Sequence, residues 1–354
     1  MGTPLFSAGL KSDGSAFAWG HNGNGQLGDQ TVTNRSSPVA VVGGHAFVQI
    51  SGATADVSIL NFIAALKADG SVWAWGYNGQ GQLGNQTITN RSSPVAVAGG
   101  HSFTKLFTGG WHTLALKANG EVWAWGGHSG TNSGFLGDNT VNNRSSPVSV
   151  VGGHSFVTIS AGNEHSLALK SDGSAWAWGD NLWGALGDQT QTDKSSPVAV
   201  AGGHSFIAIS GTTFTSAGLK ADGSVWTWGS GSWGALGNQT TTDRSSPVAV
   251  AGNHGFIAID GGWGGYICLK ADGSVWTWGY NGQGQLGDQT ITHKSSPVAV
   301  AGGHSFIGIS FGRLHALGRK ADGSVWAWGD NEQGELGDWT TTNRSSPVAV
   351  VGTV

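Results

Sequence analysis

The sequence predicts an all-β protein, a seven-bladed β-propeller built from four-stranded blades, and three observations lead to this prediction. The string Lys-x-Asp/Asn-Gly recurs along the whole chain, beginning at Lys11, Lys67, Lys117, Lys170, Lys220, Lys270 and Lys320. Successive copies lie 56, 50, 53, 50, 50 and 50 residues apart, and the extra residues fall within 53–64 and 127–135. Glycine, with 62 of the 354 residues, favours short strands joined by many turns. We therefore assign residues 1–354 to a single domain.

Each unit is predicted to contain four strands, which is the third observation. In the unit from His204 to Asn253, apolar and polar residues alternate, as in half-buried strands. The alternating segments are Phe206–Ser210, Ser216–Lys220, Ser224–Gly229 and Pro247–Ala251. The pair Asp222-Gly223 predicts a β-hairpin with a type I′ turn between the second and third segments. Such a unit cannot bury both faces alone, so neighbours must stack, and seven copies favour a closed ring.

The two ends of the chain are expected to close the ring by sharing one blade. Residues 2–11 align without gaps with residues 211–220, in the middle of a unit, and the chain finishes with the last strand of its unit, at 347–350. The strand that opens with histidine occurs six times, at His45, His101, His154, His204, His254 and His304. The other strands occur seven times, so one blade is short of a strand unless residues 1–4 or 351–354 replace it. Two explanations stay open: a strand-donating partner or a homo-oligomer fills the gap, or the sequence is a piece of a longer chain.

A recurring motif resembles that of a known repeat family. It combines Gly-x-x-His-(Ser/Thr)-Leu-Ala-Leu with x-Asp-Gly-x-Val-x-x-Trp-Gly-x-Asn-x-x-Gly-Gln-Leu-Gly. Its best instances are Gly109–Leu116, Gly162–Leu169 and Trp73–Gly84. The motif resembles the repeat of the regulator of chromosome condensation family, of a bacterial or viral type, over essentially the whole chain. This resemblance implies a seven-bladed propeller, but it does not name a ligand, because one fold serves many functions.

Three glycine-rich strings match the dinucleotide-binding pattern GxGxxG. They are Gly23–Gly28, Gly79–Gly84 and Gly282–Gly287. The dinucleotide-binding fingerprint requires a helix directly after the glycines, whereas here a polar run ending in Ser-Ser-Pro follows. We therefore predict structural loops and no cofactor.

Histidines and cations repeat with the unit and are predicted to be structural. Six of the 12 histidines open the same strand, and His112, His165 and His315 share another repeat position. Equivalent positions are spread around a ring, whereas zinc needs ligands within about 2.0–2.1 Å. We therefore predict no metal site and expect imidazoles that bond to backbone between blades. The Lys or Arg before each Ser-Ser-Pro is expected to pair with the Asp or Asn after Leu-Gly and so to tie down a long loop.

Charge and hydropathy exclude two classes of partner. The net charge is −4 and the pI is near 6.3, which gives no basic field for nucleic acid. Three of the 17 Lys and Arg lie outside the repeat positions: Lys105, Arg313 and Arg319. No stretch approaches 18 consecutive apolar residues. We expect no nucleic-acid partner and no membrane insertion.

No residue is predicted to be catalytic. Most of the 21 carboxylates are explained by turns, and no Ser-His-Asp or Cys-His arrangement with a family signature is present. Cys268 lies in a predicted strand and is expected to be buried and inert. The prediction is therefore that the protein is not an enzyme.

Tryptophan gives the clearest indication of a binding surface. Thirteen of the 18 belong to a strand pair typified by Trp73 and Trp75, with Phe17 replacing one, and are expected to pack blade on blade. The other five vary between units and lie in predicted loops or turns. These are the predicted ligand-binding residues: Trp111, Trp183, Trp233, Trp263 and Trp339.

The predicted function is a non-enzymatic binding or display module, part of a larger surface assembly, whose loop faces contact a protein or a glycan. Low charge, abundant Ser, Thr and Asn, and loop tryptophans indicate this, and they favour an extracellular location or a cell or virus surface over the cytoplasm. The alternative is a propeller enzyme or intracellular regulator with its site at one mouth of the central channel. Near-identity of several units favours the binding module, because a catalytic site needs unlike groups held together.

Overall fold

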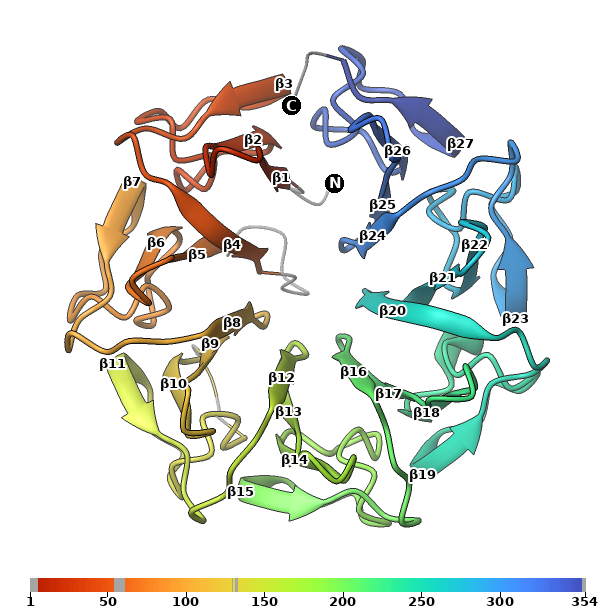
Figure 1. Ribbon diagram of the computed structural model, residues 1–354, viewed down its shortest axis with the longest axis horizontal. Helices are drawn as coiled ribbons and strands as arrows, with labels where there is room; N and C mark the ends of the chain where they lie inside the picture. Colours follow the sequence, from red (N-terminus) through yellow and green to blue (C-terminus); the bar gives the residue numbers. More distant parts are fainter. Residues whose placement is uncertain (1–5, 54–60, 129, 131–132, 352–354) are drawn as a thin grey trace.

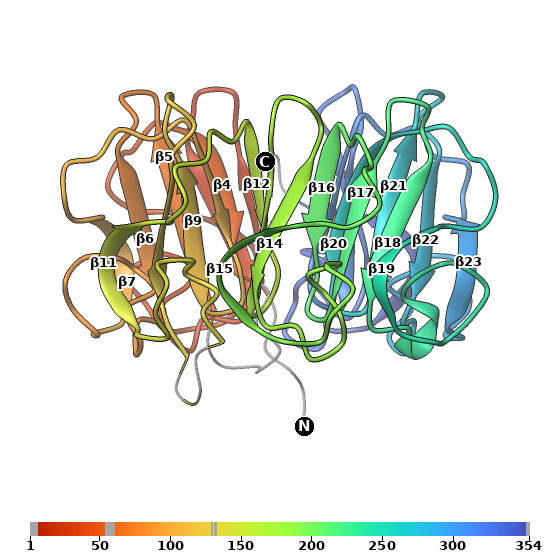
Figure 2. The ribbon, with the colours of Figure 1, turned by 90° about the horizontal axis from the view of Figure 1, so that it is seen from below.

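The computed structural model describes residues 6–53, 61–128, 130 and 133–351, and its strands form seven sheets around a central channel (Figure 1). Each sheet is one blade, and its strands run between the two flat sides of the ring (Figure 2). In the described residues the only helix is a single 3-10 turn, η1 (Ser232–Gly234). No helix in this part of the chain has the length and apolar character needed to span a membrane. The predicted all-β, seven-bladed propeller is confirmed.

The strands follow the chain blade by blade. Blade 1 contains β1 (Phe6–Leu10), β2 (Ala16–Gly20) and β3 (Arg35–Ala40), and blade 2 contains β4 (Phe47–Gly52), β5 (Phe62–Lys67), β6 (Val72–Gly76) and β7 (Arg91–Ala96). Blade 3 contains β8 (Lys105–Thr108), β9 (His112–Leu116), β10 (Val122–Gly126) and β11 (Arg144–Ser149), and blade 4 contains β12 (Thr158–Ala161), β13 (His165–Leu169), β14 (Ala175–Gly179) and β15 (Lys194–Ala199). Blade 5 contains β16 (Ala208–Gly211), β17 (Thr215–Leu219), β18 (Val225–Gly229) and β19 (Arg244–Ala249), and blade 6 contains β20 (Phe256–Gly262), β21 (Gly265–Lys270), β22 (Val275–Gly279) and β23 (Lys294–Ala299). Blade 7 contains β24 (Gly308–Phe311), β25 (His315–Arg319), β26 (Val325–Gly329) and β27 (Arg344–Ala349).

Strands that are neighbours in the sequence are antiparallel neighbours in each blade, with the inner strand beside the channel and the outer strand at the rim (Figure 1). The outer strand is longer than predicted, because β19 begins at Arg244, three residues before Pro247. The pairing of β19 with β18 is bulged there, and the extra residues are on β19: Thr227 pairs with Val248, whereas Gly229 pairs with Arg244. A strand at the edge of a sheet tolerates the proline, which has no N–H to donate.

The predicted hairpin between the second and third strands forms, but its turn type was predicted wrongly. Only Gly223 of the Asp222-Gly223 pair has a positive φ, of 78°. Its N–H donates to the carbonyl of Lys220 at 3.0 Å. The Asp222 carboxylate accepts the N–H and the hydroxyl of Ser224 at 2.9 and 2.6 Å. Because the aspartate side chain stabilises its own turn, one left-handed glycine suffices and a type I′ turn is not needed.

The second tryptophan of each third strand joins neighbouring blades, as predicted. In blade 5, Trp228 is fully buried and its Nε1 donates to the carbonyl of Ala185 in blade 4 at 2.9 Å. Trp19 of blade 1 donates in the same way to the carbonyl of Glu335 in blade 7, at 2.8 Å. The interface between the last and first blades is therefore held by the same contact as the others.

The strand-opening histidines do not make the expected backbone bonds between blades. His204 instead packs against Trp226 of its own blade, with ring centroids 4.4 Å apart, and Lys220 Nζ lies 4.4 Å from the centroid of that indole. The other repeated set does connect blades, but through hydroxyls: His165 Nε2 lies 2.9 Å from Ser216 Oγ. The nearby carbonyl of Ala185 already accepts the Ser216 hydroxyl and the Trp228 indole N–H, which use both of its lone pairs.

Blade 1 has three strands in the described residues, with β1 innermost. The last strand, β27, stays in blade 7 and pairs with β26. The two segments that could replace the seventh inner strand are residues 1–4 and 351–354, and apart from Val351 they lie outside the described residues. The sharing of one blade by both ends therefore stays a prediction. The two inserted segments, 53–64 and 127–135, are described only in part.

Candidate functional site

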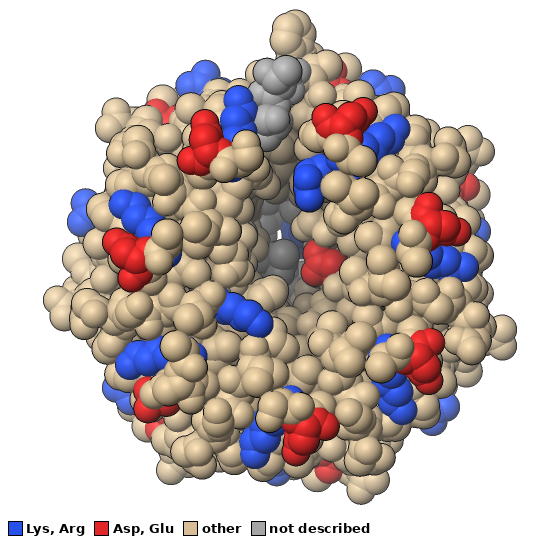
Figure 3. Space-filling view, in the orientation of Figure 1, with Lys and Arg blue, Asp and Glu red and all other residues tan. Residues whose placement is uncertain are grey.

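The two sides of the ring carry different loops. Because adjacent strands are antiparallel, the connections from inner to second strand and from third to outer strand share one side, which we call the long-loop face. The other side, the hairpin face, carries turns such as 220–224. Figure 3 shows basic and acidic side chains lying side by side around the hairpin face. This charge pattern repeats from blade to blade, so it distinguishes no single position on the hairpin face.

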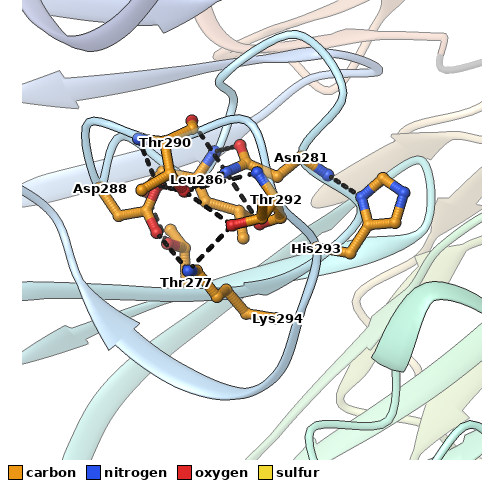
Figure 4. A network of polar contacts seen from close by, with 8 residues as sticks. All are labelled: Thr277, Asn281, Leu286, Asp288, Thr290, Thr292, His293 and Lys294. Carbon is orange, nitrogen blue, oxygen red and sulfur yellow. Dashed lines mark hydrogen bonds and ion pairs between the residues drawn. The ribbon is translucent and has the colours of Figure 1, made fainter.

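Each long loop between the third and outer strands is held by polar contacts (Figure 4). In blade 6, Asn281 Nδ2 donates to Asp288 at 3.1 Å, and Asp288 also accepts the Thr290 hydroxyl at 2.7 Å. Lys294 Nζ pairs with the same carboxylate at 3.3 Å. Burial alone raises the pKa of Asp288, but the bonds from Thr290 and Lys294 outweigh it and hold the pKa below its usual value. The predicted pairing is confirmed in the five blades that have an aspartate after Leu-Gly. It is not found for Arg91, whose blade has Asn85 at that position and whose Nε has no hydrogen-bond partner among the described residues, nor for Arg244 with Asn238. Gly282–Gly287 lies within this loop, as expected.

One of the five tryptophans predicted to bind a ligand, Trp111, is buried rather than exposed. Trp111 is 3% exposed, and its ring packs edge-on against His128 at 4.2 Å. Trp183 and Trp339 are 40% and 72% exposed and lie in the long loops of blades 4 and 7. Trp111 is therefore a core residue, whereas the other two are open to a ligand.

Trp233 and Trp263 come together with Tyr280, and we call these three residues the aromatic cluster. The two indole centroids are 4.9 Å apart, and the Tyr280 ring stands nearly perpendicular to both, at 5.5 and 5.0 Å. Trp233 is 37% exposed and has a left-handed backbone, with φ of 57°. That conformation costs about 1–3 kcal/mol in a residue other than glycine and is typical of functional sites. Packing against the other two rings offsets this cost.

Arg313 connects the aromatic cluster to the central channel. Its guanidinium carbon lies 5.8 Å from the ring centroid of Trp263, and the backbone N–H of Trp263 donates to the Arg313 carbonyl at 3.3 Å. Arg313 also lines the central cavity, which has a volume of about 250 Å³. The repeat pattern had already set Arg313 apart as a cation outside the repeat positions. Tyr280 was missed, because Tyr77 occupies the equivalent position in another blade.

The cavity contains a carboxylate where other blades have a hydroxyl. Asp260 stands at the position that is serine in four other inner strands: Ser51, Ser160, Ser210 and Ser310. Its two oxygens accept the N–H groups of Gly261 and Phe311, each at 2.9 Å. Burial raises the pKa of Asp260 to about 6, against the opposing effect of these bonds. The substitution of Asp for Ser was visible in the sequence, but only the fold places it in the channel.

Two further acidic groups are buried at the interface of blades 7 and 1. Glu335 and Asp330 are 0% and 1% exposed. Burial raises the pKa of Glu335 to about 8 and that of Asp330 to about 6, and each carboxylate has another acidic group nearby. Glutamine occupies the position of Glu335 in three other blades, at Gln26, Gln82 and Gln285. Both groups lie inside the protein and are therefore not accessible to a ligand on the long-loop face.

Two family models match the chain. The model of the RCC1-like domain matches residues 60–354, and the model of the regulator of chromosome condensation (RCC1) repeat matches residues 13–54. The chain belongs to the RCC1 family. The resemblance predicted from the repeated motif is confirmed.

Curated relatives in the RCC1 family are longer than this chain. The ultraviolet-B receptor UVR8 of Arabidopsis thaliana is 29% identical over 178 residues, which cover 49% of this chain and 38% of the receptor. The human E3 ubiquitin-protein ligase HERC2 is 31% identical over 179 residues, which cover 49% of this chain and 4% of the ligase. The matched segments therefore span less than half of either relative.

Solved RCC1-like structures share the fold across nearly the whole chain. Prp20p of Saccharomyces cerevisiae superposes with a TM-score of 0.85 at 20% identity, covering 97% of this chain and 87% of Prp20p. Human WBSCR16 superposes with a TM-score of 0.83 at 21% identity, covering 96% and 94%. At these identities the likeness shows the fold alone.

Proposed function

We propose that this RCC1-family chain is a non-enzymatic protein-binding module whose binding site is the aromatic cluster (Trp233, Trp263 and Tyr280) together with Arg313. One observation carries the proposal: unlike large side chains from blades 5, 6 and 7 meet on the long-loop face of an otherwise repetitive ring. Tryptophan, tyrosine and arginine are the residue types that contribute most to protein–protein binding energy.

The chemistry of the site indicates the kind of segment it binds. The exposed part of Trp233 offers an apolar ring surface to a partner side chain. Arg313 is half-buried beside the channel mouth, and its positive charge, which already acts on Asp330, favours an acidic side chain of the partner nearby. The ligand is therefore a protein segment that presents an apolar side chain next to an acidic one. The yeast relative Prp20p, whose fold is similar, is described with binding properties to Gsp1p and histones, which supports a protein ligand over a glycan.

A peptide selection tests the proposal. The immobilised chain is used to select binders from a displayed random-peptide library, and their dissociation constants are measured by fluorescence anisotropy. We expect Trp233→Ala and Arg313→Ala each to weaken binding by about tenfold or more, which corresponds to about 1.4 kcal/mol. Trp339→Ala is the matched control, because it removes an exposed tryptophan from the same face, and it should bind like the parent chain.

Two results would contradict the proposal. One is a set of selected peptides that bind the parent chain, Trp233→Ala and Arg313→Ala equally well. The other is a chain that selects no peptide but binds a glycan array through Trp183 or Trp339. Thermal denaturation of each variant shows whether the fold is intact before the affinities are compared.

A further inference from the structure

Pairs of side-chain amides bridge four of the interfaces between blades on the long-loop face. In each pair, the asparagine before Arg-Ser-Ser-Pro donates from Nδ2 to an amide oxygen of the preceding blade, on the residue that stands before a loop glycine. The four pairs are Asn34 with Gln333, Asn90 with Asn24, Asn143 with Gln80 and Asn343 with Gln283, with distances between 2.7 and 2.9 Å. The interface between blades 3 and 4 has Ser133 and Asp193 at these positions.

The two interfaces of blade 5 differ in both members of the pair. Trp183 and Trp233 stand before the loop glycines of blades 4 and 5, where the bridged interfaces have asparagine or glutamine. The residues that face these positions from blades 5 and 6 are Asp243 and His293, where the bridged interfaces have asparagine. An indole has an N–H donor but no acceptor for an amide N–H. Within the described part of the chain, the amide bridge is therefore replaced by an exposed tryptophan on both sides of blade 5 (Figure 1).

Asp243 and His293 keep the contact that holds the long loop of their own blade. Asp243 accepts the N–H of Gly231 at 2.8 Å, and His293 Nδ1 accepts the N–H of Asn281 at 3.0 Å (Figure 4). The asparagines of the bridged interfaces accept the equivalent N–H. The exchange therefore leaves each loop in place and changes the group that is offered next to the tryptophan.

The group next to Trp233 is a hydrogen-bond donor. His293 is exposed and stacks on Tyr280 with ring centroids 4.7 Å apart, so it extends the aromatic cluster. Because Nδ1 accepts the Asn281 N–H, the neutral imidazole carries its hydrogen on Nε2. Together with the positive charge of Arg313, this donor favours an acidic residue of the ligand at the aromatic cluster.

The group next to Trp183 has the opposite character. Asp243 places a carboxylate where the bridging asparagines have an amide. Asp180, in the loop that carries Trp183, adds a second carboxylate, and the adjacent cation Arg244 offsets one of these two charges. Leu182, which is 60% exposed, enlarges the apolar surface beside the 40% exposed Trp183. This part of the face therefore suits an apolar residue that is followed or preceded by lysine or arginine.

We propose that the binding surface continues from the aromatic cluster across blade 5 to a second anchor, formed by Trp183 and Asp243. This inference rests on the proposed function, because one ligand contacts both anchors. The ligand is a protein segment with two apolar residues: one, next to an acidic residue, contacts the aromatic cluster, and the other, next to a basic residue, contacts Trp183. Joining two contacts in one segment raises its affinity, and the opposite charges fix the direction in which it lies.

Peptides selected on the parent chain from the displayed library test the second anchor. The library is built with about 20 random residues, which reach up to about 65 Å when extended and can cross neighbouring blades. Dissociation constants are measured by fluorescence anisotropy. We expect Trp183→Ala to weaken the selected peptides by about tenfold or more, and Trp339→Ala, the matched control, to bind them like the parent. Peptides shortened by their basic half should still lose affinity for Trp233→Ala but should bind Trp183→Ala and the parent equally.

A double variant tests the same anchor with the loops held in place. Trp183→Gln combined with Asp243→Asn recreates the pair that Gln283 and Asn343 form at a bridged interface, so the chain should fold with a thermal midpoint no lower than that of the parent. It should nevertheless lose the affinity that Trp183→Ala loses. Asp243→Asn alone should weaken a peptide with its lysine or arginine intact, and should have little further effect once that residue is replaced by glutamine.

The result with Trp233→Ala separates failure of the second anchor from failure of the proposed function. If Trp233→Ala weakens the selected peptides but Trp183→Ala and the double variant bind them like the parent, the second anchor is wrong and the proposed function stands. The second anchor is also wrong if the effect of Asp243→Asn is the same with and without the basic residue of the peptide. If Trp233→Ala also binds like the parent, or the library yields no binder, both are wrong.

Discussion

Glu335→Gln should make the protein more stable at neutral pH and leave it nearly unchanged in acid. The side chain is fully buried where blade 7 meets blade 1, and the Glu335 carbonyl accepts bonds from Ser7 and Trp19 of blade 1. One carboxylate oxygen accepts the N–H of Gln333 at 2.9 Å, while Oε1 has no hydrogen-bond partner among the described residues. Burial of a charge without enough partners is costly, and glutamine at the same position in three blades shows that the site accepts an amide.

The magnitude follows from the raised pKa of Glu335. The pKa is about 8 in the folded protein and near 4.5 in the unfolded chain. Below pH 4.5 both states hold the proton, so the residue does not change stability with pH. Between pH 4.5 and 8 only the folded state keeps it, so the free energy of unfolding falls by up to about 1.4 kcal/mol per pH unit. Relaxation of the protein around the charge reduces this loss of unfolding free energy. We therefore expect Glu335→Gln to raise the free energy of unfolding by on the order of 2 kcal/mol at pH 7.

Urea denaturation followed by tryptophan fluorescence measures the effect at pH 4.5 and pH 7.5. Glu332→Gln, at an exposed acidic residue of the same loop, is the matched control and should change stability by less than about 0.5 kcal/mol at either pH. The reasoning is refuted if Glu335→Gln is less stable than the parent at pH 7.5, or if the difference between the two proteins is the same at both pH values.

Three further predictions concern single residues. Trp111→Ala should lower the free energy of unfolding by about 3–5 kcal/mol because it empties a buried site, whereas Trp339→Ala should change it by less than about 0.5 kcal/mol; similar thermal shifts for both would be inconsistent with their burial. Asp260→Ser should stabilise the protein at pH 7 but not below pH 4. The reason is that the pKa of Asp260 is raised to about 6 in the folded protein, so the parent chain loses stability as the pH rises toward 6. Urea titrations in which the variant remains more stable than the parent below pH 4 would argue against the buried charge as the cause. Asp138→Asn removes the ion pair with Arg144 and should cost less than about 1 kcal/mol at pH 7. Since the pKa of Asp138 is lowered, that cost should vanish as acid protonates the parent, and a cost that grows in acid would contradict the assignment.

The seven-bladed ring could be predicted from the sequence because the number and length of the repeated units limit the folds that the chain can adopt. Seven evenly spaced hairpin strings and alternating segments leave few folds that bury every unit. The hairpin turn could not be predicted as well, because the bonds from Asp222 to Ser224 compete with the turn type that the Asp-Gly pair favours. The local sequence pattern was sufficient to predict the strands of each blade, but it did not predict the side-chain hydrogen bonds that decide the type of the hairpin turn.

The candidate site was predictable only in part. Trp111 and Trp263 both follow glycine in a loop before a second strand, yet Trp111 directly precedes β9 while Trp263 lies two residues before β21. A shift of one residue turns a side chain toward the opposite side of a sheet, which buries the first tryptophan and leaves the second near the surface. The contact of Trp233 with Tyr280 joins two blades and depends on a left-handed residue, so repeat spacing alone does not reveal it.

Hydrogen–deuterium exchange of the full chain, with and without a selected high-affinity peptide, tests most directly whether the long-loop face is the binding surface. The account predicts slower exchange in residues 231–239 and 262–265 when the peptide is bound, with the hairpin 220–224 unchanged. Protection confined to the hairpins, with no change around Trp233 and Trp263, would contradict it.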